Sequence, residues 1–210
     1  MSEFRNSVKS GRTLLGCFIK TASHQVVELV ARAGQDFAIV DAEHAPFDLL
    51  TLDRMALAAR ATDLTLLVRI PDHNATFVGQ VLDMGFDGVL APHVASPEAA
   101  THLVEAALFE AGKRGFSPST RAGQYGGVEA NAYRRAADAA VSVWGQIEDA
   151  EALPQLDAIA AVDRLDCLFL GRADLAGSLG VDSIGDERVQ QAVRATAVAG
   201  AGQGKAVGIY

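Results

Sequence analysis

Short apolar runs alternate along this chain with longer segments in which apolar residues recur every three or four positions. The first pattern is typical of strands buried on both faces, and the second of amphipathic helices that cover them. The apolar runs predict seven strands, at residues 14–20, 37–41, 64–70, 88–92, 141–146, 165–170 and 206–210. Strands that alternate with helices in this way indicate a parallel α/β sheet.

Helix signals stand between these runs. Ser23 can cap a first helix, Gly85 is a stop signal for the third, and Pro97 suits the first turn of the fourth. After the first, helices are expected at residues 48–61, 74–84, 97–111 and somewhere between 186 and 202. The connection at residues 112–129 is long and holds five glycines, so it is expected to be a lid or binding loop.

Two architectures fit this alternation, a (β/α)₈ barrel and an open doubly wound sheet. The barrel is favoured because the turn after the first strand, Lys20-Thr-Ala-Ser23, lacks the glycines of a dinucleotide-binding turn. The segment Gly123-Gln-Tyr-Gly-Gly127 follows no strand and is expected to be a mobile loop. We expect one domain over residues 1–210, a barrel that lacks its last strand and helix.

The composition of the chain limits the kinds of molecule that it is expected to bind. The net charge of −8 and the pI near 5.0 argue against nucleic acid and against anionic membranes. Cys17 and Cys167 lie in apolar runs and are expected to be reduced, buried thiols. The chain shows no apolar signal core at its beginning and no membrane-spanning run, so we expect a cytoplasmic protein.

Four of the apolar runs end on charged or ionisable groups. They lead into Asp41-Ala-Glu43-His44, Arg69, Gln146-Ile-Glu148 and Gly171-Arg-Ala-Asp174. Because the carboxyl ends of parallel strands open on one face, these groups are expected to converge. Two acids, an arginine and a histidine flanked by acids suit a metal-assisted reaction on a small anion.

The same segments carry a family resemblance. Asp41-Ala-Glu-His-Ala-Pro46, Val68-Arg69, Gln146-Ile-Glu148 and Gly171-Arg-Ala-Asp174-Leu resemble the class II, metal-dependent pyruvate aldolases typified by 4-hydroxy-2-oxoheptanedioate aldolase and 2-dehydro-3-deoxyglucarate aldolase. The resemblance spans about residues 12–210. It implies a barrel of the phosphoenolpyruvate/pyruvate superfamily, a homohexamer, and reversible joining of pyruvate, as its metal-bound enolate, to an aldehyde.

Glu148 and Asp174 are the candidate metal ligands. Two carboxylates without a third protein ligand describe a hard cation that keeps open positions, Mg²⁺ or Mn²⁺, with Co²⁺ as a further candidate. Pyruvate can fill two of those positions through its carboxylate and keto oxygens. The competing interpretation is that each acid caps a following helix, which suits Asp174 better than Glu148.

Arg69 ends an apolar strand, so its guanidinium needs either an acidic partner or an anionic ligand. The resemblance implies that it donates to a pyruvate oxygen and stabilises the enolate. An imidazole held by a carboxylate can act as base and acid near neutral pH. The resemblance gives that role to His44, oriented by Asp41, although a lone loop histidine is usually inert.

The resemblance also implies contacts to the bound substrate. Gln146 would contact substrate or metal-bound water, and the backbone amides of Ala173 and Asp174 would hold the pyruvate carboxylate. Arg121, in the segment expected to be a lid, matches an arginine of the family and is a candidate contact for the acceptor.

Some positions depart from the family pattern. Arg172 stands where proline is usual, Phe18 where tryptophan is common, and Lys20 and His93 where relatives have small or apolar residues. Arg172 and His93 are therefore candidate contacts to an acceptor carboxylate or hydroxyl, with exposed loop positions as the alternative. Lys20 leaves open a Schiff-base aldolase. A barrel that only binds a metal and an oxoacid, without catalysis, is the remaining alternative.

Overall fold

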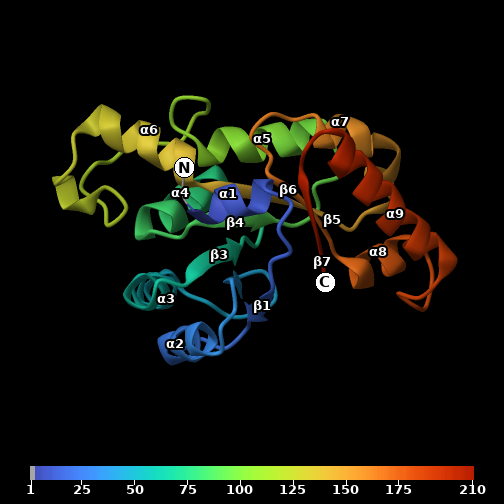
Figure 1. Ribbon diagram of the computed structural model, residues 1–210, viewed down its shortest axis with the longest axis horizontal. Coiled ribbons are helices and arrows are strands. Elements are labelled where there is room, and N and C mark those ends of the chain that lie inside the picture. The colour runs from blue at the N-terminus through green and yellow to red at the C-terminus, as the bar shows by residue number, and fades with distance from the viewer. Residues whose placement is uncertain (1–2) are drawn as a thin grey trace.

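A seven-stranded, all-parallel sheet forms the centre of the computed structural model, which describes residues 3–210 (Figure 1). The strands are β1 (Gly16–Ile19), β2 (Phe37–Asp41), β3 (Thr65–Arg69), β4 (Gly88–Ala91), β5 (Ser142–Ile147), β6 (Cys167–Leu170) and β7 (Ala206–Ile209). Their order in the sheet is the order of the sequence. This is the order of a barrel wall, whereas a doubly wound sheet reverses direction, so the barrel-like alternative is the correct one.

The sheet curves until its first and last strands approach. The ring of Phe18 in β1 lies 4.9 Å from the ring of Tyr210, the residue after β7, and 6.0 Å from that of Phe169 in β6. All seven predicted strands are present, each within two residues of the expected ends. The result is an open barrel whose wall, over the described residues, has seven strands.

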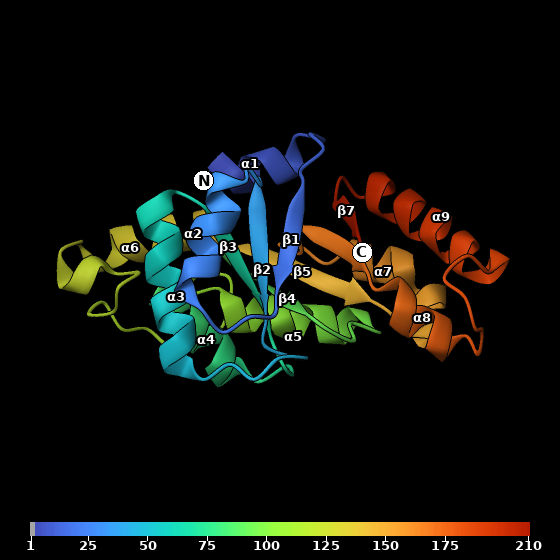
Figure 2. The ribbon, with the colours of Figure 1, turned by 90° about the horizontal axis from the view of Figure 1, so that it is seen from below.

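Helices cover the outside of the wall (Figure 2). They are α2 (His24–Arg32), α3 (Leu49–Thr62), α4 (Ala75–Met84), α5 (Pro97–Ala107), α6 (Ala130–Ala140), α7 (Leu156–Ala160), α8 (Arg172–Ser178) and α9 (Glu187–Gly202), with 3₁₀ turns η1 (Gln124–Gly126) and η2 (Ala150–Gln155). The expected start and stop signals are confirmed: Ser23 caps α2, Pro97 opens α5, and Gly85 ends α4 in the left-handed conformation. No helix among residues 3–210 has the length and apolarity to cross a membrane.

A short helix, α1 (Glu3–Lys9), closes the amino end of the barrel, which the sequence did not predict. Phe4 packs against Phe37 and Trp144 inside the wall, with ring centroids 5.6 and 6.1 Å away. Arg5 donates to the carboxylate of Asp166 at 2.8–3.1 Å, a buried ion pair that fixes α1 beneath the barrel. Cys167, in the same interior cluster, is a buried free thiol as expected, and Cys17 is free and partly buried.

One helix boundary needs correction, and two further helices were missed. The helix at Pro97 ends at Ala107 rather than near residue 111, because the carboxylate of Asp138 accepts from the backbone amides of Phe109 and Glu110 at 2.8 Å and holds the following turn. Helices α6 and α7 were not predicted, whereas α8 begins where a helix start was expected, beside Asp174. Most apolar residues of α6 are alanines, and Glu129 caps its start.

A lid was expected to cover the carboxyl ends of the strands. The glycine-rich connection at residues 112–129 lies instead at the other end of the barrel. Its Ala122 amide donates to the carbonyl of Asp83, at the end of α4. It borders a cleft of about 510 Å³ shared with residues 63–65 and 85–87, at the starts of β3 and β4. Within this chain, the segment therefore does not cover the carboxyl ends of the strands.

Candidate active site

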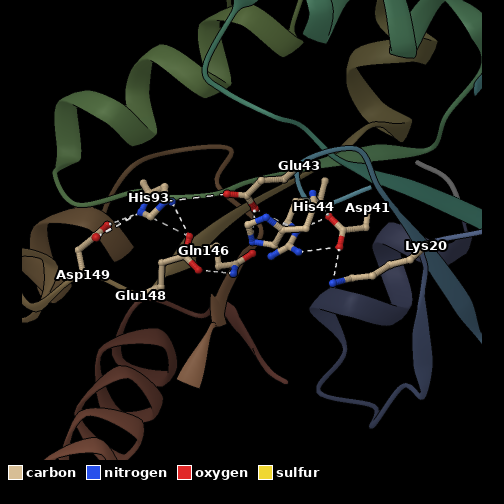
Figure 3. A network of polar contacts seen from close by, with 9 residues as sticks. Lys20, Asp41, Glu43, His44, His93, Gln146, Glu148 and Asp149 are labelled. Atoms are coloured by element: carbon tan, nitrogen blue, oxygen red, sulfur yellow. Dashed lines mark hydrogen bonds and ion pairs between the residues drawn. The ribbon is translucent and has the colours of Figure 1, made fainter. Parts of the chain in front are cut away.

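Strand alternation places the charged residues inside the mouth of the barrel. Ile39, Leu67 and Trp144 belong to the interior cluster, and successive side chains of a strand point to opposite faces. Two residues further along the same strands, Asp41, Arg69 and Gln146 therefore point inward as well, with Glu148 following β5. Figure 3 shows Asp41, Gln146 and Glu148 gathered at the carboxyl ends of the strands, as the sequence predicted.

Arg69 and Asp41 form a buried ion pair. The guanidinium donates from Nε to Oδ1 at 2.9 Å and from Nη2 to Oδ2 at 2.8 Å, and Glu43 Oε2 lies 3.2 Å from Nε. Lys20 Nζ is 3.2 Å from Asp41 Oδ2. Burial alone would raise the pKa of Asp41, but the hydrogen bonds and charge of Arg69 lower it below its usual value. Arg69 thus has the acidic partner that its position required.

His44 lies on the loop after β2, with its side chain half exposed. Its backbone amide donates to Asp41 Oδ1 at 3.2 Å, and its ring Nε2 is 3.7 Å from Glu43 Oε2. Asp41 therefore holds His44 through the backbone, whereas the expected contact was to the imidazole. The reason is that both Asp41 oxygens already accept from Arg69, so Glu43 is the carboxylate beside the ring.

Glu148 is the buried carboxylate at the end of β5, with its side chain only 2% exposed. Gln146 Nε2 donates to Glu148 Oε2, while Gln146 Oε1 is buried with no hydrogen-bond partner. Gly171 packs directly against both side chains. A Cβ at Gly171 would stand 2.6 Å from Glu148 Oε2 and 2.7 Å from Gln146 Nε2, so a larger residue here would displace the ends of these two side chains.

The carboxylates around Glu148 create an excess of negative charge. Burial raises the pKa of Glu148, and the charges of Asp174 and Glu43 raise it further, opposed by a hydrogen bond and charge from His93. Asp174 lies exposed in the first turn of α8, whose N-cap is Gly171, so it does not cap that helix. Hard oxygen donors, a buried carboxylate with further carboxylates around it and an orphaned amide oxygen fit a hard divalent cation.

The protein could supply only part of such a coordination shell. Among residues 3–210 there is no group of three or more His, Cys, Asp or Glu side chains placed to hold a metal ion. A cation at Glu148 and Asp174 would therefore keep several positions for water or substrate, as expected for Mg²⁺ or Mn²⁺ rather than a closed zinc site.

His93 joins this cluster, as the sequence suggested, together with two acids that were given no role. Its ring Nδ1 lies 3.1 and 3.2 Å from the oxygens of Asp149, and its backbone amide donates to Glu148 Oε1 at 2.9 Å. Burial alone would lower the pKa of His93, but Asp149, Glu148 and Glu43 raise it. Asp149 directly follows Glu148, and Glu43 directly precedes His44. Their position next to motif residues is the feature of the sequence that could have identified both acids.

The other candidate acceptor contacts lie outside this network. Arg121 pairs with Asp53 at 2.7 Å and donates to the carbonyl of Met84 at 2.9 Å, beside the cleft at the amino ends of the strands. Arg172 donates from Nε to the carbonyl of Tyr210 at 2.8 Å. Ala173 is exposed in the first turn of α8, beside Asp174. Within this chain, Arg121 is thus remote from Glu148.

Comparison with known proteins identifies the family. The profile of the HpcH/HpaI aldolase/citrate lyase family matches residues 14–209. A hydroxypyruvate/pyruvate aldolase of Roseobacter denitrificans is 34% identical over 182 residues, which cover 86% of this chain and 70% of that protein. A 4-hydroxy-2-oxovalerate aldolase of Novosphingobium aromaticivorans is 36% identical over 183 residues, 86% of this chain and 69% of that protein.

A solved structure agrees with these sequence relatives. The crystal structure of an HpcH/HpaI aldolase/citrate lyase family protein from Burkholderia cenocepacia superposes with a TM-score of 0.93 at 32% identity, covering all of this chain and 84% of that one. This chain belongs to the HpcH/HpaI aldolase/citrate lyase family. The resemblance inferred from the four strand-end motifs is confirmed.

Proposed function

We propose that this chain is a divalent-metal-dependent aldolase that reversibly joins pyruvate, as its enolate, to an aldehyde. The observation that carries the proposal is the buried Glu148 carboxylate, beside Asp174 and Gln146 and at the same barrel mouth as Arg69. The family and the aldolases among its relatives support the reaction class.

Glu148 and Asp174 would hold the cation, for which Mg²⁺ and Mn²⁺ are the leading candidates and Co²⁺ the third. When bound there, the metal supplies positive charge to stabilise the oxyanion that forms as pyruvate enolises. Gln146 faces the same point and would orient the substrate through its unpartnered Oε1 or a bridging water. The amides of Ala173 and Asp174 are the proposed donors to the pyruvate carboxylate.

Arg69 would stabilise the same oxyanion. Asp41 and Glu43 fix its guanidinium in place, so little reorganisation is needed when negative charge develops on the substrate. His44 would transfer the proton on the acceptor side, because its ring is half exposed and reaches the open mouth of the barrel.

The alternative imine mechanism has less support in the geometry. Lys20 is directed towards Asp41, at the opposite end of the cluster from Glu148 and Asp149 (Figure 3). Its amine is engaged by a fully buried carboxylate. We therefore assign Lys20 to the support of Asp41 and Arg69.

The remaining features of the proposal rest on the family resemblance. The proposed assembly is a homohexamer of (β/α)₈ barrels of the phosphoenolpyruvate/pyruvate superfamily, acting in the cytoplasm on small molecules. Acceptor contacts from Arg121 would then be made towards a neighbouring subunit, because within the chain it lies beside Asp53. Gel filtration coupled to light scattering tests the assembly directly.

The test of the proposed function is metal rescue. Chelation should abolish aldol cleavage and addition, added Mn²⁺ should restore them, and Glu148→Gln and Asp174→Asn should weaken Mn²⁺ binding as measured by calorimetry. Activity that survives chelation, with borohydride trapping pyruvate on Lys20, would favour the imine mechanism. Binding of Mn²⁺ and pyruvate without turnover would favour the non-catalytic barrel.

A further inference from the structure

We infer that His93 and Asp149 form a pair that selects the acceptor, favouring an aldehyde that carries an uncharged hydroxyl group next to its carbonyl. The inference rests on the proposed function, because it concerns the second substrate of that reaction. It is carried by the geometry of His93 within the network of Figure 3.

His93 is held in an unusual conformation. Its φ is +52°, in the left-handed region that only a few per cent of non-glycine residues adopt, with asparagine, aspartate and histidine the most frequent among them. The conformation directs the backbone amide to Glu148 Oε1 at 2.9 Å, and the Nδ1 of the ring to Asp149. Because the side chain remains 58% exposed, its burial contributes little free energy to offset the cost of this backbone conformation. Strain of this kind persists at functional sites.

The carboxylate of Asp149 interacts with His93 and does not cap the helical turn that follows it. It precedes η2 but makes no side-chain capping hydrogen bond there. Its two oxygens lie 3.1 and 3.2 Å from Nδ1 of His93. A carboxylate on Nδ1 fixes the ring orientation and leaves Nε2 as the nitrogen available to a ligand.

Nε2 of His93 lies on the open side of the cluster. Its nearest recorded charged neighbour is Glu43 Oε1, at 3.9 Å, which is too long for a hydrogen bond. The ring therefore spans the mouth between Asp149 and Glu43, beside Glu148. An aldehyde that reacts with pyruvate held at Glu148 would therefore lie within reach of this nitrogen.

The charges around the ring decide between a hydroxyl and a carboxylate on the acceptor. Glu43 Oε1 lies 3.9 Å from Nε2, so a further carboxylate bound at Nε2 would lie beside a like charge. A hydroxyl carries no charge and can both donate and accept a hydrogen bond. The site thus fits an α-hydroxyaldehyde better than an aldehyde acid.

A matched pair of acceptors tests this. Glycolaldehyde and propionaldehyde differ in that a hydroxyl replaces a methyl group, so the ratio of their kcat/KM values isolates the hydroxyl contact. His93→Asn suits the left-handed backbone, and His93→Leu provides a second variant without a polar side chain. In both, the glycolaldehyde-to-propionaldehyde ratio should fall by about tenfold or more.

Asp149 is a positioning residue in this account. Asp149→Ala should lower the ratio by about threefold, through a higher KM for glycolaldehyde, and should have no further effect when combined with His93→Asn. His102→Asn, an exposed histidine on α5, is the matched control and should leave the ratio unchanged. Additive effects of the two variants would overturn the role of Asp149.

Two outcomes separate this inference from the proposed function. If wild-type protein with Mn²⁺ exchanges the pyruvate methyl protons but His93→Asn and His93→Leu leave the acceptor ratio unchanged, the inference is wrong and the aldolase stands. A wild-type preference for glyoxylate over glycolaldehyde overturns it equally. If wild-type protein exchanges no methyl protons, the proposed function itself fails.

Discussion

Asp41 and Arg69 face each other in register at the ends of β2 and β3, joined by two hydrogen bonds of 2.9 and 2.8 Å. Asp41 is fully buried, and the Arg69 side chain is 7% exposed. Removing either partner leaves a charge that the interior does not solvate, which typically costs about 3–5 kcal/mol. The pair is therefore both a structural element and the support of the proposed oxyanion donor.

Because of this pairing, Arg69→Lys tests the catalytic role better than Arg69→Ala. Lysine keeps the positive charge opposite Asp41 but loses the planar fork that binds two oxygens at once. We expect pyruvate methyl exchange and aldol cleavage both to fall by about 10²–10³, with little change in melting temperature. Arg69→Ala should lose both activity and stability. Wild-type exchange in Arg69→Lys would show that the oxyanion role is wrong.

His44→Ala should separate the two half-reactions. The side chain is half exposed and its recorded ion pair is with Glu43, so the substitution should leave folding intact. Aldol cleavage should slow by about 10²-fold, while deuterium exchange into pyruvate stays near the wild-type rate. Following both by proton NMR on one sample makes the comparison. Equal losses in the two assays would place His44 in enolisation instead.

Gly171→Ala should disturb the metal site without touching a charged residue. The added Cβ would displace Glu148 Oε2 and Gln146 Nε2, which lie 2.6 and 2.7 Å from it. We expect Mn²⁺ affinity to fall at least about tenfold, by analogy with losses from disrupted outer-shell contacts. Gly177→Ala, in α8, is the matched control because its Cβ meets nothing within 4 Å. Equal affinities in the two variants would contradict the placement of Glu148.

Asp87 lies away from the active site, and its raised pKa predicts that the stability of the fold depends on pH. Burial raises the pKa of Asp87 to about 6 from 3.8, despite the hydrogen bond from the Leu66 amide. The folded state therefore holds its proton more tightly than the unfolded state, and this carboxyl destabilises the fold increasingly as pH rises from about 4 to 6. Above pH 6 the full cost, up to about 3 kcal/mol, is present.

Asp87→Asn removes that cost. Urea unfolding should show the variant more stable than wild type by up to about 3 kcal/mol at pH 8, with the difference shrinking towards zero near pH 4. The amide can still accept from Leu66, so the hydrogen bond is kept. A difference in unfolding free energy that does not change with pH would exclude the raised pKa.

The strands and their charged ends were predictable because each strand is a distinct apolar run and each of the four charged motifs follows one. The alternation that turns Leu67 and Arg69 to the same face is a property of any strand. The motif residues therefore come together at one end of the barrel when the parallel sheet curves. The missing glycine turn after the first strand favoured the barrel, and the sequential strand order of the structure confirms that choice.

The contacts that lie between motifs were not predictable. Asp41 was expected to orient the His44 ring, but register places it opposite Arg69, and only the three-dimensional pairing of β2 with β3 reveals this. The position of Arg121 depended likewise on the path of residues 112–129, which packs beside Asp53 and α4. Helix α1 was missed because Phe4 and Val8 gain their apolar partners only inside the closed barrel.

The central claim is that Glu148 and Asp174 hold a divalent cation that makes the pyruvate methyl group acidic. The most direct measurement is proton NMR of pyruvate in D₂O with metal-stripped protein, before and after addition of Mg²⁺, and again after EDTA. We predict exchange only when the metal is present, and none in Glu148→Gln at any Mg²⁺ concentration that leaves the protein folded. Exchange that is equally fast in EDTA, or undiminished in Glu148→Gln, would contradict the claim.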